Sequence, residues 1–180
     1  MITIIAGSNN RKSKAFHFAN HYYKTLKRKT KEVVILLDLK DLPSDMSHPD
    51  MYSADGQSPI VKNMQDQCML PAQKFVFVIP EYNGSFPGVL KVFLDACSVR
   101  EYSATFSGKK AALTGIASGR AGNIRGMDHL CDILHHLGTI VHPNKLPISN
   151  IESLIDEKGK IIDTDCKKAL KKHMEDLLAF

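Results

Sequence analysis

The segment KFVFVIPEYNGSFPGVLKVFLDACS, residues 74–98, joins a strongly apolar run to a helical pattern through a loop rich in polar and aromatic residues. The run FVFVI at 75–79 is typical of a strand that is covered on both faces. After the loop, apolar residues recur at helical spacing from Val89 to Cys97. The segment therefore predicts a strand, a loop and a helix, which is the repeating unit of a parallel sheet.

The rest of the chain continues this alternation. Strands are predicted at residues 2–6, 33–37, 75–79, 110–116 and 139–142, and helices from residue 13, over 59–69, after residue 87, after residue 122 and over 164–179. Five strands alternating with five helices predict one α/β domain over residues 1–180, doubly wound, with helices on both faces of a parallel sheet of order 2-1-3-4-5. The loop 38–58 is long for such a domain, so it is a candidate for covering a ligand or contacting another subunit.

Composition narrows the class of protein. The 180 residues are 43% hydrophobic and 24% charged, which is ordinary for a soluble globular protein. No apolar run approaches the roughly 20 residues that span a bilayer, and MITIIAGSNN does not resemble a signal peptide, so we expect a cytoplasmic protein without a membrane partner. The net charge of +5 suits anionic ligands but is too small to indicate nucleic acid.

Cysteine and histidine spacing indicates neither a metal site nor a catalytic side chain. The four cysteines are widely spaced, without a CxxC pair, and are predicted to be reduced thiols. The eight histidines are scattered and are interpreted as surface or packing residues. No convincing nucleophile, triad or carboxylate pair is present, so any chemistry is expected to reside on a cofactor.

Three unusual loops follow the predicted strands one, three and four: GSNNRKS at 7–13, PEYNGSFPG at 80–88 and ASGRAGN at 117–123. In a sheet of order 2-1-3-4-5, ligands bind beyond the carboxyl ends of the strands, between strands one and three. All three loops would face that crevice. This coincidence predicts a ligand site there.

The first loop is a candidate phosphate site. It lacks the glycines and lysine of a Walker loop and does not match GxGxxG. Ser8, Asn10 and Ser13 offer polar side chains beside the N–H groups of a helix start, which suit a phosphate, and Arg11 adds a charge. The alternative is simple capping, with Ser13 as the N-cap.

The second loop divides in two. Gly84 permits a bend, while Ser85 is a predicted N-cap and Pro87 suits the first helical turn. Local structure does not explain the preceding four residues. These are interpreted as an edge that presents backbone N–H groups and an aromatic side chain to a flat heterocycle: Pro80, Glu81, Tyr82 and Asn83.

Two of these residues have alternative interpretations. Tyr82 could lie at an interface or at the edge of the core, and Glu81 could be an ion-pair partner. The third loop is less specific: Ser118 and Gly119 would let a ligand ring approach the backbone closely, but glycines are common at helix starts.

Together, AGSNNRKS, PEYNGSFPGVLKVFLDACS and GKKAALTGIASGRAGNIRGMDHLCDILHHLG resemble the NADPH-dependent FMN reductase family of the flavodoxin-like superfamily, over roughly residues 1–145. The resemblance implies a flavodoxin-like three-layer sandwich that binds FMN. It implies that the FMN phosphate lies on Ser8, Asn10 and Ser13, with Arg11 close by. It further implies that the isoalloxazine ring lies against residues 80–83 and near Ser118 and Gly119.

Two residues depart from the family pattern. Asn10 stands where the family often has arginine, with Arg11 displaced by one position, which puts phosphate neutralisation in doubt. Ala96 stands where the family often has tryptophan, so one aromatic contact, which could lie between subunits, is missing.

The resemblance implies an enzyme that passes a hydride from NADPH or NADH through FMN to a quinone, an azo compound, free flavin or a metal oxyanion. It also implies a homodimer or homotetramer. One rival is a narrower role, in which the protein feeds reduced FMN to an oxygenase. Another is a non-catalytic electron carrier or FMN-sensing regulator; such carriers tend to be acidic, and the charge of +5 disfavours that role.

Overall fold

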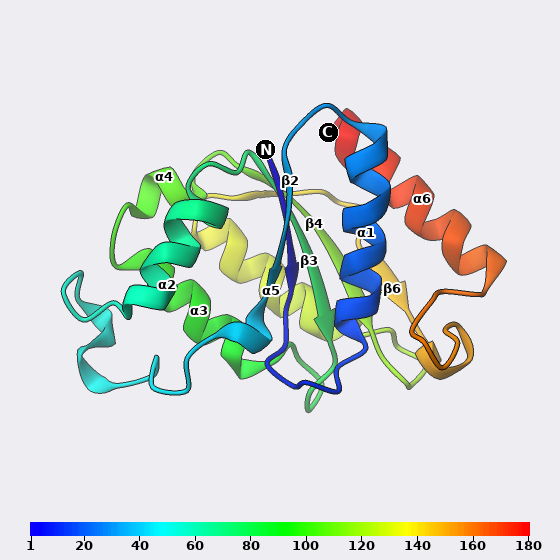
Figure 1. The fold of residues 1–180 in the computed structure, drawn as a ribbon, viewed down its shortest axis with the longest axis horizontal. Helices are drawn as coiled ribbons and strands as arrows, with labels where there is room; N and C mark the ends of the chain where they lie inside the picture. Colours follow the sequence, from blue (N-terminus) through cyan, green and yellow to red (C-terminus); the bar gives the residue numbers. More distant parts are fainter.

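The computed structural model describes residues 1–180 and contains a parallel sheet of six strands between two layers of helices (Figure 1). The strands are β1 (Ile2–Ala6), β2 (Val34–Asp38), β3 (Lys74–Pro80), β4 (Lys110–Ile116), β5 (Ile140–Val141) and β6 (Leu146–Ile148). They follow the order β2-β1-β3-β4-β5, and β6 also pairs with β4. The predicted α/β class and strand order are therefore confirmed.

Helices cover both faces of this sheet. They are α1 (Ala15–Lys29), α2 (Pro59–Met64), α3 (Gly88–Ser98), α4 (Tyr102–Phe106), α5 (Ile124–His136) and α6 (Thr164–Ala179). Apolar side chains of α1 and α6, such as Phe18 and Leu170, form one core with Ile4 and Val76 of the sheet. The opposite face packs against α2 to α5, where Phe93 is fully buried. Alternate residues of each central strand point into different cores, which explains the unbroken apolar runs.

The edge of the sheet differs from the prediction of one strand at 139–142. The short β5 pairs with the start of β4, and the chain then leaves the sheet at Pro143 before β6 pairs with the end of β4. Proline cannot donate a ladder hydrogen bond, so it separates the two strands. The added strand β6 carries the chain back to the carboxyl ends of the central strands.

Two helical predictions also need correction. The helix predicted over 59–69 is α2 followed by a π-helical turn, Gln65–Met69, and the first helix begins at Ala15 rather than at residue 13. The short helix α4 was not predicted. None of the helices is both long and apolar enough to cross a membrane.

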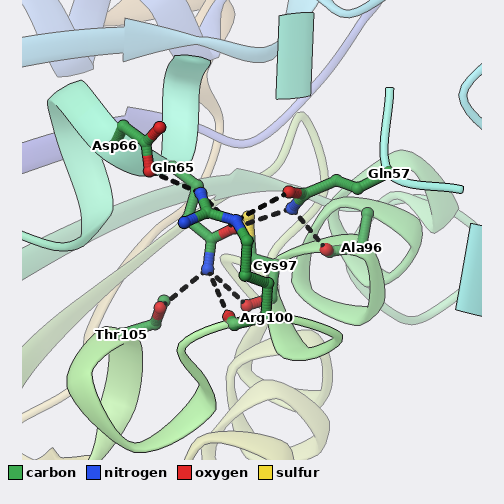
Figure 2. A network of polar contacts seen from close by, with 7 residues as sticks. All are labelled: Gln57, Gln65, Asp66, Ala96, Cys97, Arg100 and Thr105. Atoms are coloured by element: carbon green, nitrogen blue, oxygen red, sulfur yellow. Dashed lines mark hydrogen bonds and ion pairs between the residues drawn. The ribbon is translucent and has the colours of Figure 1, made fainter. Parts of the chain in front are cut away.

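A buried polar network anchors the end of loop 38–58 (Figure 2). The Gln57 side-chain amide donates to Gln65 Oε1 and to the Ala96 carbonyl, each at 2.7 Å. Gln65 is fully buried, and its own amide donates to the carbonyl of Cys97 at 2.8 Å. Arg100 forms an ion pair with Asp66 beside it. The loop is therefore fixed to α3 and to the π-helical turn at this end.

Candidate functional site

A cleft of about 510 Å³ lies beyond the carboxyl ends of β1, β3 and β4. These strand ends point toward the lower edge of Figure 1. The lining of the cleft comes from the three loops predicted to meet there and from one further segment: Asn10, Lys12, Ser13, Lys14, residues 80–84, residues 116–119, Ile151 and Glu152. The size lies within the range of small-molecule sites. The structure thus brings eight of the ten predicted site residues to one cleft; Ser8 and Arg11 lie elsewhere.

Those two residues line a smaller adjoining pocket of about 110 Å³, which Asn10 and Ser13 also line. Lys40 contributes a second cation there and pairs with Asp38 at 2.8 Å. The Asp38 carboxylate, which hydrogen-bonds Lys40, raises the pKa of that ammonium. Lys40 was not among the predicted site residues, because only the fold brings the end of β2 beside the first loop.

The first loop is held by its own side chains. Ser8 Oγ accepts from the backbone N–H of Asn10 at 3.2 Å, and Asn10 Oδ1 accepts from the N–H of Lys12 at 2.9 Å. Ser13 accepts from the N–H of Ala15 at 3.3 Å, but the N-cap position is Lys14, which makes no side-chain cap. The prediction that Ser13 is the N-cap is therefore wrong by one residue, and the helix start keeps donors for a ligand.

The second loop is a tight hairpin turn. Tyr82 and Ser85 exchange two backbone hydrogen bonds, at 2.8 and 3.0 Å. Between them, Asn83 has φ +51° and Gly84 has φ +75°, the two positive values of a type I′ turn. Ser85 is therefore not an N-cap; α3 begins at Gly88, with Pro87 at the cap position. The Asn83-Gly84 pair is the local sequence signal for this turn.

A hydrogen bond connects the first two loops. Asn10 Nδ2 donates to the Tyr82 hydroxyl at 3.0 Å. The Tyr82 ring remains 40% exposed, so it has a free surface beside the cleft. Both residues thus help to shape the mouth of the cleft.

The third loop is locked by Asn123, which no prediction included. Asn123 is buried and caps α5: its Oδ1 accepts from the N–H of Gly126 at 3.2 Å. Its Nδ2 donates to the carbonyls of Ile79 and Pro80 at 3.2 and 2.9 Å. One side chain therefore sets the third loop against the end of β3. An asparagine directly before a helical pattern was the available signal.

The fourth wall of the cleft follows β6, in the orange segment of Figure 1. The backbone N–H of Asn150 donates to the Gly119 carbonyl at 3.3 Å. The backbone N–H of Ile151 donates to the Ala117 carbonyl, also at 3.3 Å. An ion pair between Glu152 and Lys14 joins this wall to the start of α1. Asp38 and Lys40, at the start of loop 38–58, line the adjoining pocket, whereas residues 41–58 line neither that pocket nor the cleft.

The donors in the cleft suit a flat, acceptor-rich ring. The backbone N–H groups of Asn83, Gly84, Ser118 and Gly119 border the cleft and donate to no acceptor within the chain. Within the first loop, the backbone N–H groups of Asn9 and Arg11 are likewise unpaired. Such groups bind carbonyl oxygens, ring nitrogens or a phosphate without a catalytic side chain.

Comparisons with known proteins give a consistent result. The model of a family described as NADPH-dependent FMN reductase matches residues 1–153. An NAD(P)H-dependent FMN reductase of Pseudomonas aeruginosa is 33% identical over 145 residues, which cover 79% of this chain and 75% of the relative. A 2-hydroxy-1,4-benzoquinone reductase of Burkholderia is 32% identical over 133 residues, which cover 72% and 73%.

Solved structures share the fold. The flavoenzyme FerB of Paracoccus denitrificans, an NAD(P)H:(acceptor) oxidoreductase, superimposes with a TM-score of 0.79 at 22% identity, covering 99% of this chain and 94% of that chain. The azoreductase AzrA superimposes with a TM-score of 0.65 at 16% identity, covering 99% of both chains. At these identities the likeness shows the flavodoxin-like fold alone, which agrees with the expected three-layer sandwich.

Proposed function

This chain belongs to the NADPH-dependent FMN reductase family, and we propose that its cleft binds FMN and passes a hydride from NAD(P)H to a small-molecule acceptor. The chain is an oxidoreductase that uses FMN and NAD(P)H. The observation that carries the proposal is the set of unpaired N–H groups at the cleft, because they match the acceptors of a flavin ring.

The phosphate belongs at the first loop. Ser8, Asn10 and Ser13 offer polar atoms there, and the positive end of α1 lies beside them. Arg11 lines the same small pocket and has no carboxylate partner, so its charge is available to an anion. The arginine that the family often has one residue earlier is thus replaced by a neighbouring cation.

The ring belongs between the second and third loops. The cleft is lined by Pro80, Glu81, Tyr82 and Asn83 of the second loop and by Ser118 and Gly119 of the third. Bound FMN supplies the capacity to accept and return a hydride, and the protein supplies orientation and electrostatics. Unpaired N–H groups stabilise negative charge that develops on a ligand. The cleft is open to water, which can supply protons, so no acidic side chain needs a role.

A quinone is the acceptor that we favour, because a relative 32% identical is named for the reduction of 2-hydroxy-1,4-benzoquinone. The open cleft and the exposed Tyr82 ring suit a flat molecule. Azo compounds, free flavin and metal oxyanions are the other acceptors to test. Steady-state rates with NADPH and NADH should be measured against a benzoquinone, an azo dye, FMN and chromate. No oxidation of either donor above the rate without enzyme would contradict the proposal.

A homodimer or homotetramer and a cytoplasmic location stay predictions. Tyr52 is 69% exposed and Ile60 is 48% exposed, both at or beside loop 38–58. Large apolar side chains on an anchored loop that lies outside the cleft suit a subunit contact. Light scattering on the eluting protein would measure the mass, and a monomer at micromolar concentration would contradict this prediction.

A further inference from the structure

A basic cavity of about 260 Å³ lies apart from the cleft, on the face covered by α1 and α6. Lysines from three segments line it: Lys24 of α1, Lys158 and Lys160 of the turn before α6, and Lys167 of α6. His17 and His21 of α1 add polar side chains, and no carboxylate lines the cavity. Four cations around one hollow create a field that attracts anions.

None of these four lysines pairs with a carboxylate, whereas eight other lysines of the chain do, such as Lys91 with Asp95 and Lys29 with Glu175. Lys167 only donates to the Ile162 carbonyl, at 2.9 Å. Burial lowers the pKa of His21, and the charges of Lys167 and Arg28 lower it further. The cavity therefore holds positive charge that the protein itself does not neutralise.

The turn that carries two of the lysines is rigid. Asp156 Oδ1 accepts from the N–H groups of Lys158 and Lys160, at 3.0 and 2.8 Å. Gly159, with φ +76°, lies so close to α1 that a Cβ there would be 2.1 Å from the His17 ring. Both lysines thus project from a backbone already fixed against α1, which lowers the entropy cost of binding a ligand.

A third cavity, of about 270 Å³, adjoins both the basic cavity and the cleft: it shares Lys14 and Glu152 with the cleft, and it shares His17 and Gly159 with the basic cavity. From Lys14 to Lys24, α1 runs ten residues, or about 15 Å. This length is comparable with that of an extended dinucleotide. The middle cavity also contains Asp156 and Glu157, so the positive charge is concentrated at the far end.

We propose that the basic cavity binds the phosphates of the adenosine half of the electron donor, the 2′-phosphate included, so that the protein prefers NADPH to NADH. The inference rests on the proposed function, because the nicotinamide would lie in the cleft while the rest of the donor extends past the third cavity to the basic cavity. Lysine ammonium groups bind phosphate as point charges. NADH lacks the 2′-phosphate, so the lysines of the basic cavity contribute less to its binding.

The test uses the double variant Lys158→Gln/Lys160→Gln on the full chain. Its matched control is Lys31→Gln/Lys62→Gln, which removes the same charge at two exposed lysines without carboxylate partners. Calorimetric titration with adenosine 2′,5′-bisphosphate should give binding about tenfold weaker in the cavity variant than in the control. In steady state, the KM for NADPH should rise by a similar factor while kcat stays the same, and the KM for NADH should rise less, because NADH lacks the 2′-phosphate. Equal bisphosphate affinity in the two variants, or equal effects on NADPH and NADH, would overturn the inference.

Two further measurements separate this inference from its premise. FMN uptake by the wild type tests the proposed function, whereas the bisphosphate titration reports on the basic cavity even if no FMN binds. Inorganic phosphate is the second probe: binding as tight as that of the bisphosphate would make the cavity a general anion site and overturn the assignment to the donor. We expect phosphate to bind at least tenfold more weakly.

Discussion

Asn123 Nδ2 donates to the carbonyl oxygen of Pro80 at 2.9 Å, which ties the start of α5 to the end of β3. The same side chain also caps the helix, so one residue fixes the second and third loops of the cleft relative to each other. Asn123 itself is in the left-handed region, with φ +58°. Its functional role is therefore one of positioning rather than ligand contact.

Replacing this side chain should loosen the cleft. Asn123→Gly keeps the left-handed backbone but removes the cap and leaves two buried carbonyls with fewer donors. We expect a loss of about 2–3 kcal/mol in the free energy of unfolding, measured in urea. The matched control is Asn150→Gly, because Asn150 has φ +52° but makes no side-chain cap. A change within about 0.5 kcal/mol is expected there. If both variants lost the same free energy of unfolding, the Asn123 side chain would have no special role in fixing the two loops.

Two variants of Asn83 test whether the backbone of the hairpin turn or the Asn83 side chain matters for FMN binding. Asn83→Gly preserves the type I′ turn, so FMN affinity should change less than about threefold. Asn83→Ala forces an alanine into φ +51°, which costs about 1 kcal/mol or more and should weaken FMN binding about five- to tenfold. FMN fluorescence quenching would measure both. A glycine variant as weak as the alanine variant would mean that the Asn83 side chain itself binds the ring.

The phosphate assignment makes a prediction about two ligands. Arg11→Gln should weaken FMN about three- to tenfold, because it removes an exposed cation beside the first loop. Riboflavin lacks the phosphate, so its affinity should stay the same in the variant. An equal effect on both flavins, measured by the same fluorescence titration, would place Arg11 away from the phosphate.

Buried polar groups predict how stability depends on pH. His173 is 1% exposed; its Nε2–H donates to the Asn144 carbonyl at 3.1 Å, and its Nδ1 accepts from the Tyr22 hydroxyl at 2.7 Å. Burial lowers the pKa of His173 from about 6.5 to about 4. Below about pH 6.5, His173 becomes protonated in the unfolded chain, whereas in the folded protein it stays neutral until about pH 4. The free energy of unfolding should therefore fall between these values, by up to about 3 kcal/mol.

Urea unfolding at pH 7.5, 6, 5 and 4.5 would measure this dependence. His173→Gln should be less stable at pH 7.5 and should show a shallower fall toward pH 4.5. His48→Gln, in the loop 38–58, should keep the fall of the wild type, because His48 makes no side-chain cap hydrogen bond. An equally steep fall in the His173 variant would assign the acid sensitivity to other groups.

Local patterns predicted much of the fold. Strand 110–116 and helix 164–179 have the predicted bounds, because unbroken apolar runs and helical periodicity are strong signals. The edge strand was not predicted in two parts, since strand pairing beyond Pro143 depends on the neighbouring β4. The turn at Asn83 and Gly84 was not predicted, although Asn-Gly is a strong local signal for a type I′ turn.

The site was predicted less completely than the fold. Order 2-1-3-4-5 brings the three loops together, so their residues could be chosen from the sequence. Ile151 and Glu152 reach the cleft only because β6 returns to the sheet, and Lys40 reaches the first loop only through the end of β2. These contacts depend on tertiary structure and leave no local signal.

An anaerobic titration of the FMN-loaded protein with NADPH, followed by the flavin absorbance, tests most directly whether this protein is an FMN-dependent reductase. The purified protein should take up FMN, become yellow and be bleached by about one NADPH per flavin, and adding a benzoquinone should restore the colour. A protein that takes up no FMN, or a yellow protein that NADPH cannot bleach, would contradict this prediction. The latter result would instead indicate an electron carrier or an FMN sensor.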